Sequence, residues 1–559
     1  MDKLPQELID RIGSYLEIND LKKILLLNTK LQRAAERYSE AFSTYTLTED
    51  NVGDFLDFCG GRLAQHLRNI KFRTSLPALD TDVFKNNMKA FEENPCRDTV
   101  DELREMDEQF TRQVNLLFTT LHSIEQIRSL DGHRGFELEI YTPTRAVDET
   151  KFCLHRAITS WRIHIIAPES LPRIECIRSL CIQDGTRLEY VDIANPPFRK
   201  SDLRILLDLA APLSNLQVLN CNIGGDEFVK GLDVEEARYS LQDWPGPRRD
   251  SRHDFAKAIQ SVQLPTSLMH MDLDFIYPIG AADWIDQRLQ MPNLVKPAIH
   301  DPFSSSLRIL SYQLRTMKLR VVADESLFWP ADESTPSWPN LESLSVMFHP
   351  VSPSGAWYFE GSCDVDTGPN EGFEIGDLSY PPLEYTDEDG NADYEVDWDF
   401  NFDSHPVYAQ YRVKPVNKTL EPFLTAFTKA AALMPSLKEA ALWSPLMFYP
   451  KDMKEYEGFD YKEVSQVVEG ELAWGIAYTK PRTQCFTDAI GEDFAAFRQM
   501  WWYVGDWRPD PELLDLFRLI GREEQDDEQI SMYWGDPFNS PGLVERGMFE
   551  DWESWRFHH

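Results

Sequence analysis

The sequence contains no long apolar run. No stretch of about 18 apolar residues occurs among its 559 residues, so we expect no membrane-spanning segment. The N-terminus is an amphipathic stretch with acidic residues, and it lacks the basic leader and apolar core of a secretory signal. These absences predict a cytoplasmic and/or nuclear protein that does not partner a membrane.

Cysteine is scarce and irregularly placed. The eight cysteines form no CxxC pair, which is typical of reduced, partly buried thiols in an intracellular protein. Cys153, His155, Cys176 and Cys181 form the one Cys/His cluster, and their spacing fits no usual zinc pattern. We therefore expect small core residues at Cys176 and Cys181, and no bound metal.

Motifs that carry known catalytic chemistry are absent as well. The chain has no GxGxxG, Walker loop, GxSxG or HExxH sequence. Ser251, His253 and Asp254 lie too close in sequence for a triad, whose members come from separate segments. Ser251 is instead expected to cap a helix that begins near His253, while the neighbouring arginines pair with carboxylates. The prediction is a protein without catalytic residues or cofactors.

Basic residues are outnumbered. The chain has 56 Lys and Arg against 93 Asp and Glu, a net charge of −37. Residues 1–50 carry seven basic and nine acidic residues, so 7 − 9 = −2, and −35 lies downstream. Such a surface repels phosphate backbones and anionic lipid, which argues against nucleic acid and membranes as partners. It favours a basic partner surface, or it serves solubility alone.

An amphipathic stretch opens the chain. Leu4, Leu8, Ile12 and Leu16 recur every four residues and form one apolar stripe on a helix, with Pro5 suited to its first turn. Two more helical runs follow, the first of them capped by Asn19 or Asp20 and the second covering 29–38. Three short helices cannot bury all these leucines among themselves. Part of this surface is therefore expected to contact another protein.

The same stretch resembles an F-box. The residues that carry the resemblance are Leu4-Pro5-Gln6-Glu7-Leu8, Ile12, Tyr15-Leu16, Asp20-Leu21 and Lys30-Leu31-Gln32-Arg33. Leu27-Asn28-Thr29 stands where the family often has Val-Ser, and Leu31 where it often has Trp. The resemblance implies docking on the Skp adaptor, and through it on cullin, in a ubiquitin ligase. The implied adaptor-binding residues are Leu4, Pro5, Leu8, Ile12, Leu16, Leu21 and Leu25.

An apolar triplet recurs through the rest of the chain, with the second and third residues two apart on one face of a short strand. The copies are Ile177/Leu180/Ile182, Leu188/Val191/Ile193, Leu216/Leu219/Cys221, Leu268/Met271/Leu273, Leu314/Met317/Leu319, Leu341/Leu344/Val346 and Leu437/Ala440/Leu442. Helical partners are predicted at 201–211, 252–262, 304–313 and 419–433. A single strand and helix cannot bury their inner faces, so neighbours must stack. The pattern resembles degenerate leucine-rich repeats, although an ordinary α/β domain with several strands would give similar triplets.

Residues 364–403 interrupt this pattern. They contain fourteen Asp and Glu and no Lys or Arg, which predicts a surface loop. Residues 387–398 look superficially like a calcium loop, but the glycine stands at position four and Trp398 at position twelve, so calcium is not expected. Deletion of 364–403 is accordingly predicted to leave the thermal transition nearly intact.

These observations predict an α/β protein in which a three-helix F-box precedes an irregular leucine-rich-repeat-like solenoid. The expected domains are 1–50, the F-box; 51–125, a helical linker and first repeat-like unit; and 126–559, the repeat domain. Trp501, Trp502 and Trp507 are expected to pack in the core or the cap of its tail. The function implied is a substrate receptor that holds an unknown protein. A non-ligase scaffold and an enzyme with an unrecognised pocket are the alternatives.

Overall fold

The computed structural model of the chain contains one large sheet with helices packed on it. The described residues are 4–77, 99–127, 135–144, 161–183, 199–224, 244–277, 279, 285, 287–361, 370–381, 383, 410–448, 470–483, 497–522, 530–535 and 543–557. They form a mixed α/β fold with eleven α-helices and a 13-stranded sheet dominated by parallel pairs. No helix among these residues is long and apolar enough to cross a membrane. The copy of the triplet at 188–193 lies outside the described residues.

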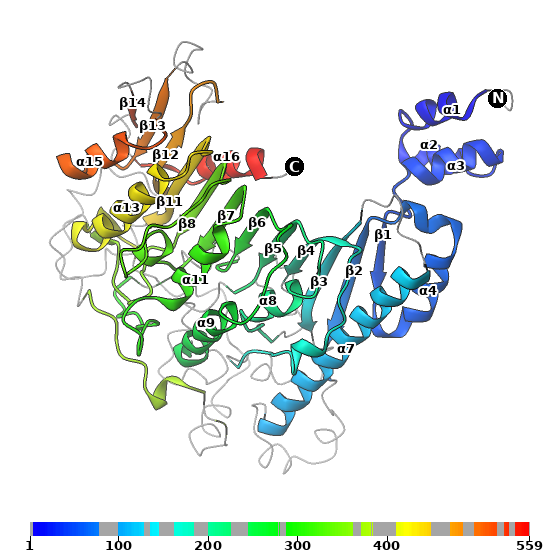
Figure 1. Ribbon diagram of the computed structural model, residues 1–559, viewed down its shortest axis with the longest axis horizontal. Helices are drawn as coiled ribbons and strands as arrows, with labels where there is room; N and C mark the ends of the chain where they lie inside the picture. The colour runs from blue at the N-terminus through cyan, green and yellow to red at the C-terminus, as the bar shows by residue number, and fades with distance from the viewer. Residues whose placement is uncertain are drawn as a thin grey trace, which may run out of the picture.

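Nine neighbouring strands of the sheet run parallel and follow one another along the chain (Figure 1). They are β1 (Thr44–Leu47), β2 (Asn69–Ser75), β3 (Phe136–Thr144), β4 (Ile177–Gln183), β5 (Val218–Asn222), β6 (His270–Asp274), β7 (Thr316–Val321), β8 (Ser343–Phe348) and β11 (Glu439–Phe448). Because the sheet begins at Thr44, its first strand falls inside the range 1–50 predicted for the first domain.

Antiparallel strands complete the sheet at its C-terminal end. They are β12 (Gly470–Thr479), β13 (Arg498–Tyr503), β14 (Ile530–Trp534), which pairs parallel with β13, and β15 (Val544–Glu545). Strands β9 (Phe359–Gly361) and β10 (Arg412–Pro415) form a separate two-stranded ribbon. The sheet therefore changes from a parallel to a largely antiparallel arrangement after β11.

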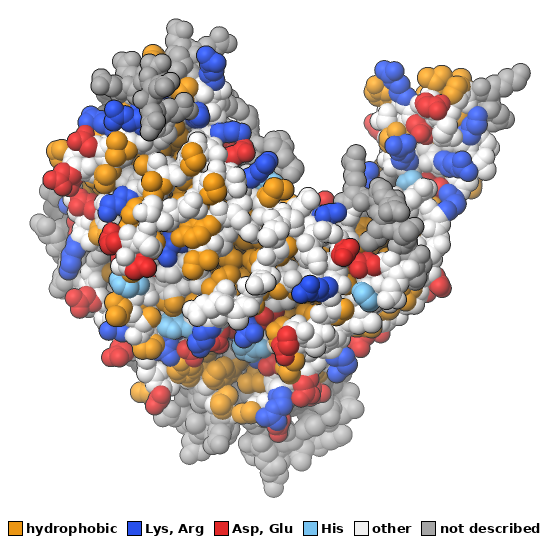
Figure 2. Space-filling view, in the orientation of Figure 1, with side chains coloured by type: hydrophobic (Ala, Val, Ile, Leu, Met, Phe, Trp, Pro, Cys, Tyr) orange, Lys and Arg blue, Asp and Glu red, His pale blue; other side chains and the backbone are white. Residues whose placement is uncertain are grey.

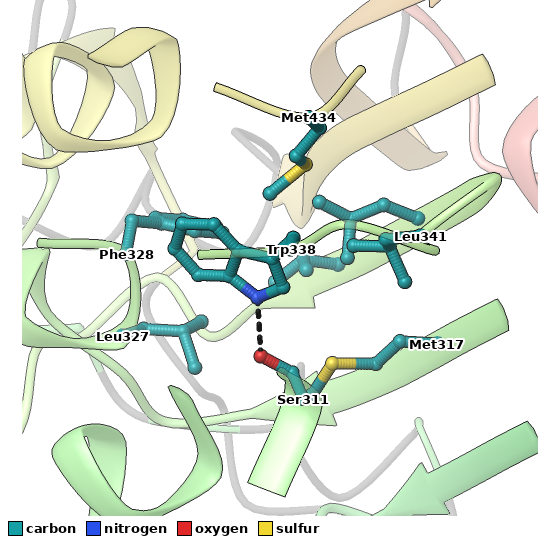
Figure 3. A pocket seen from close by; sticks show the side chains of 9 residues that line it. Ser311, Met317, Leu327, Phe328, Trp338, Leu341 and Met434 are labelled. Atoms are coloured by element: carbon teal, nitrogen blue, oxygen red, sulfur yellow. Dashed lines mark hydrogen bonds between the residues drawn. The ribbon is translucent and has the colours of Figure 1, made fainter. Parts of the chain in front are cut away.

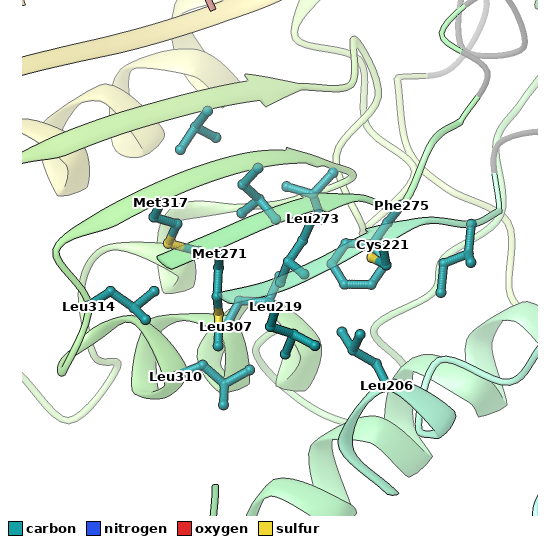
Figure 4. Packing of buried hydrophobic residues seen from close by; sticks show 14 of the residues in the cluster. Leu206, Leu219, Cys221, Met271, Leu273, Phe275, Leu307, Leu310, Leu314 and Met317 are labelled. Carbon is teal, nitrogen blue, oxygen red and sulfur yellow. The ribbon is translucent and has the colours of Figure 1, made fainter. Parts of the chain in front are cut away.

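The predicted triplets form continuous apolar rows across the strands. In the cross-strand register, the second residues of the triplets lie beside one another and form one row, and the third residues form another. The two rows are two residues apart on each strand, so they lie on the same face of the sheet. The first row includes Leu180, Leu219, Met271, Met317 and Leu344, and the second includes Ile182, Cys221, Leu273, Leu319 and Val346. Figure 4 shows members of both rows packed against Leu206, Leu307 and Leu310 of the helices.

Helices cover the face that carries these rows. They are α4 (Val52–Gly60), α7 (Val100–Ile127), α8 (Ile205–Ala210), α9 (Pro245–Ile259), α11 (Pro302–Ser311), α13 (Asn417–Ala432) and α15 (Pro511–Arg518). The four predicted helical partners are thus confirmed as α8, α9, α11 and α13, with shifted ends. Helix α16 (Gly547–Phe557) lies against the opposite face, which we call the open face.

Two tryptophans show how the C-terminal strands separate the two faces. Trp502 joins the core beneath the helices and stacks on Trp534, with ring centroids 4.8 Å apart. Trp501 points to the open face and packs against Tyr533 at 4.7 Å. Both indoles are buried, as predicted, whereas Trp507 remains half-buried.

Of two local predictions, one is wrong and the other holds only in part. Ser251 lies inside α9 and does not cap it, because α9 begins six residues earlier at Pro245, where Pro245 and Pro247 favour the first turn. The described residues 370–381 of the acidic segment form a loop, but this loop packs on the rest of the chain: the Asn370 side chain accepts a hydrogen bond from the Trp357 amide at 2.6 Å, and Ile375 is buried. The acidic composition of the segment gave no indication of these contacts.

Candidate protein-interaction surfaces

Residues 4–38 fold into a small helical unit of their own. It comprises α1 (Gln6–Gly13), α2 (Ile18–Ile24) and α3 (Thr29–Tyr38), close to the predicted positions. The Asn28 side chain caps α3 by accepting hydrogen bonds from two backbone amides. Helix α2 starts after Glu17, so the expected cap at Asn19 or Asp20 is wrong. The unit has a separate small core of Ile9, Leu31 and Ala34, onto which Leu4 and Ile24 pack.

This unit exposes a concentration of large apolar side chains, which we call the N-terminal patch. Six of the fifteen exposed large apolar residues of the described chain lie within it: Leu8, Ile12, Tyr15, Ile18, Leu26 and Leu27. Tyr15 is 78% and Leu26 95% exposed. Figure 2 shows apolar side chains at the outer end of the unit, which projects away from the sheet in Figure 1. Exposed apolar residues gathered in one small unit are typical of a protein-binding surface.

The residues predicted to bind an adaptor divide into three groups. Leu8, Ile12 and Pro5 are exposed, while Leu4, Leu16 and Leu25 are half-buried. Leu21 is only 2% exposed and lies in the interior of the unit, so it is not part of the available surface. The helical spacing correctly placed Leu8 and Ile12 on one side of α1.

Sequence reasoning overlooked four members of the N-terminal patch, namely Tyr15, Ile18, Leu26 and Leu27. The signal was available at Leu25-Leu26-Leu27, which follows α2 directly. Three consecutive leucines cannot all face the interior of a single turn. At least one of them had to be exposed, and two are.

The open face of the sheet is a second accessible surface and carries polar rows. On the N-terminal strands, Lys71 pairs with Glu139 at 2.8 Å, and the Tyr141 hydroxyl donates to Glu139 at 2.8 Å. Burial raises the pKa of Tyr141, so the phenol remains a donor at neutral pH. Further along the sheet, Lys318 pairs with Asp272 at 3.3 Å. We call the part of the open face from β2 to β7 the accessible strip; at its two ends, the charges of these two pairs neutralise each other.

Uncharged polar side chains lie between these ion pairs. Cys181 follows Glu139 in the cross-strand register, and Asn220 lies between Cys181 and Asp272. Ser179, Asn220 and Asn222 are half-buried, and their side chains make no hydrogen bond within the described part of the chain. Such groups in the middle of an open sheet are available to water or to a ligand.

Helix α16 closes the C-terminal end of the open face. Its Glu553 accepts hydrogen bonds from the Ser345 hydroxyl at 2.7 Å and the Trp443 indole at 2.9 Å. The other carboxylate oxygen of Glu553 accepts from Arg320 at 2.9 Å. The accessible strip thus ends at β7, because α16 occupies the face over β8 and β11.

A polar cavity of about 360 Å³ lies between the 164–169 segment and the start of α8. Its charged lining includes His164, Asp202, Arg204 and Asp208. Burial raises the pKa of Asp208 to about 6 and also raises that of Asp202, although Arg204 opposes the shift at Asp208. Arg204 already pairs with Asp208 at 3.2 Å. The carboxylates are thus engaged within the chain, and no group of metal-binding side chains occurs among the described residues.

An apolar gap of about 10 Å³ lies near the indole of Trp338, and Figure 3 shows its lining. The indole N–H donates to the Ser311 hydroxyl at 2.7 Å, while Leu327, Phe328 and Met434 surround it. A gap of this size holds at most one water-sized probe. It is a packing defect of the core and not a ligand site.

Ser251, His253 and Asp254 each contact a different partner. The Ser251 hydroxyl accepts a hydrogen bond from the Leu203 amide at 2.9 Å, and a ring nitrogen of His253 lies 3.1 Å from the Leu294 carbonyl. Asp254 pairs with Lys257 at 2.7 Å. This geometry contains no triad. Cys176 is buried as expected, Cys181 is half-buried, and Cys153 and His155 lie outside the described residues.

The charged run on α9 pairs within the chain, as predicted. Arg252 and Asp301 form a buried pair at 2.5 Å. Arg249 donates to the Tyr380 hydroxyl, which in turn donates to Asp250 at 2.7 Å. The run therefore holds the neighbouring segments together and offers no open anion site at these residues.

Sequence comparison adds no assignment: the chain matches no protein-family model, and no curated protein shows significant similarity to it.

Proposed function

We propose that this chain is a substrate receptor of a Skp–cullin–F-box ubiquitin ligase. The observation that carries the proposal is the N-terminal patch, in which Leu8, Ile12 and Tyr15 stand exposed on a helical unit whose sequence resembles an F-box. An adaptor that covers these side chains would remove their apolar surface from water, which contributes about 25 cal/mol per Å². Such complexes act in the cytoplasm and nucleus, where we place this chain.

The sheet supports a finer proposal about the remainder of the chain. Nine parallel strands that lie in chain order across the sheet, with helices on one face, support the proposal of a leucine-rich-repeat-like solenoid. We infer that the long and variable segments between strands are insertions into such repeats. In this reading the antiparallel strands and α16 form the C-terminal cap, which a repeat stack needs to cover its last inner face.

The open face is the proposed place for the protein substrate. Its accessible strip runs from β2 to β7 and is bounded by the Lys71–Glu139 and Asp272–Lys318 pairs. The unpaired side chains of Asn220 and Asn222 can both donate to and accept from a polypeptide backbone. The chain would select a protein and hold it, while transfer of ubiquitin belongs to other subunits.

Adaptor capture tests the proposal directly. The purified chain is mixed with recombinant Skp adaptor, and binding is measured by calorimetry for wild type and for the double variant Leu8→Asp/Ile12→Asp. Two new charges at a desolvated apolar contact should abolish detectable binding. Leu378→Asp is the matched control, because Leu378 is 96% exposed far from the patch in sequence, and it should bind as wild type does.

Two outcomes would count against the ligase role. No binding of wild type to the adaptor would reject the F-box function itself. Adaptor binding without recruitment of cullin to the complex would favour the alternative of a non-ligase scaffold. Proximity labelling in cells, with the same double variant as the reference, would then identify the proteins that depend on the patch.

A further inference from the structure

The N-terminal unit and the sheet have separate apolar cores. Ile9, Leu31 and Ala34 form the core of the unit, whereas the large core beneath the helices begins at Leu47. The three residues of the small core are not part of the large one. Apolar packing at the centre of each body therefore does not by itself set the angle between them. The contacts at the junction itself must do so.

The backbone at the junction is fastened at one point. The Ser43 carbonyl accepts hydrogen bonds from the Arg68 amide at 2.8 Å and the Asn69 amide at 2.9 Å, where β2 begins. Just before this point, Glu40 has a φ of 55°, in the left-handed region that ends helices. Residues 39–42 thus lie between the end of α3 and a fixed point on the sheet. The N-terminal unit can therefore change its orientation on the sheet only by rotation about this short segment.

A side-chain pair lies across this segment. Glu36 on α3 accepts two hydrogen bonds from Arg62, at 2.5 and 2.7 Å, and a third from Gln32 at 2.9 Å. Arg62 belongs to the 3₁₀ turn Arg62–His66 that packs against α3. Glu36 is only 4% exposed, and hydrogen bonding by Arg62 lowers its pKa, so it remains ionised at neutral pH. A two-point contact between a planar guanidinium and a carboxylate fixes direction as well as distance.

We propose that the Glu36–Arg62 pair is a clamp that sets the orientation of the N-terminal unit on the sheet. With Ser43 fastened, the clamp supplies a second fixed point and stops rotation about residues 39–42. The direction of the N-terminal patch relative to the open face is then defined. The clamp itself stands without the proposed function. Its consequence, a set distance between bound adaptor and bound substrate, rests on that function.

Distance measurement by pulsed electron spin resonance tests the clamp on the full chain. Spin labels are attached through non-natural amino acids at Lys22 on α2 and Lys257 on α9, both exposed. Wild type should give one narrow distance distribution. Arg62→Ala and Glu36→Gln should each broaden it, because the two-point contact is lost. Arg62→Lys, which keeps the charge but not the fork, should give an intermediate width.

A matched control separates orientation from general loosening of the unit. Arg37 on the same helix pairs with Asp10 inside the unit, at 3.2 Å, so Arg37→Ala should leave the distribution narrow. An unchanged narrow distribution for both Arg62→Ala and Glu36→Gln would overturn the clamp, as would equal broadening by Arg37→Ala. Adaptor affinity of Arg62→Ala, measured separately, should equal that of wild type. Failure of wild type to bind adaptor would reject the proposed function and leave the distance result standing.

Discussion

Glu553 in the last helix accepts a hydrogen bond from the indole of Trp443, 110 residues earlier in the chain, at 2.9 Å. The same carboxylate accepts from Ser345 and Arg320, on two other strands. One side chain thus joins α16 to three strands of the open face. Glu553 is 1% exposed, so water cannot take over its hydrogen bonds to these partners if the carboxylate is removed.

Glu553→Ala is expected to destabilise the C-terminal half of the protein. Removing one partner of a buried ion pair leaves the other unpaired, and the cost is about 3–5 kcal/mol. Because Arg320 also pairs with Asp274 at 3.5 Å, we expect a loss near the lower end of that range, about 3 kcal/mol. Urea unfolding followed by tryptophan fluorescence measures it. Asp551→Asn, at an exposed site on the same helix, should change stability little; an equal loss in both variants would contradict the account.

Stability should increase as the pH falls from about 7.5 to about 5.5. Burial raises the pKa of Asp274 to about 6 and that of Asp324 to about 7, against 3.8 as the ordinary value. The folded state therefore binds more protons than the unfolded state in this window, and the linkage relation gives stability that decreases as pH rises. Urea midpoints at several pH values measure the slope.

The variant Asp324→Asn isolates one group in that slope. The amide keeps an oxygen that can accept from the Ser326 amide, as Asp324 does at 3.0 Å, but it does not titrate. The slope between pH 6 and 8 should be shallower than in wild type because the pKa of Asp324 is about 7. Identical slopes for the two proteins would show that Asp324 does not contribute.

Gly475→Ala should destabilise the contact between α16 and the open face. A Cβ at Gly475 would lie 2.5 Å from the Phe549 ring and 2.7 Å from the Cβ of Trp443. Overpacking of this kind costs about 1–3 kcal/mol. Differential scanning calorimetry measures the decrease in melting temperature. Gly376→Ala, where a Cβ would meet nothing within 4 Å, is the control and should melt as wild type does.

Deletion of residues 364–403 should lower the melting temperature, contrary to the expectation from composition. Residues 370–381 contribute the Asn370 contact to Trp357, the bridge between Phe373 and Pro292, and the Tyr380 contact to α9. Loss of these contacts leaves buried groups without partners. The double variant Asn370→Ala/Tyr380→Phe should reproduce part of the decrease. A deletion variant that melts as wild type does would support the expectation from composition instead.

The sequence alone determined the local features of this protein. Helical spacing located α1 and α3, and the spacing of two within the triplets located β4 to β8 and β11, because side-chain direction alternates in a strand and repeats every 3.6 residues in a helix. The apolar rows through Leu219 and Leu273 follow directly from these short-range rules. The excess of leucine near the N-terminus likewise indicated that some of it would be exposed.

Tertiary structure decided what joins distant segments. No local rule pairs Glu553 with Trp443 or Glu36 with Arg62, because each contact depends on where the sheet brings two separate segments. The burial of Leu21, beside the exposed Leu26, depends on how three helices close around a small core. Tyr380 also packs on α9, although the acidic residues around it in the sequence predicted a surface loop. Spacing therefore specified which residues face one side of an element, and packing specified which of those sides remain free for a partner.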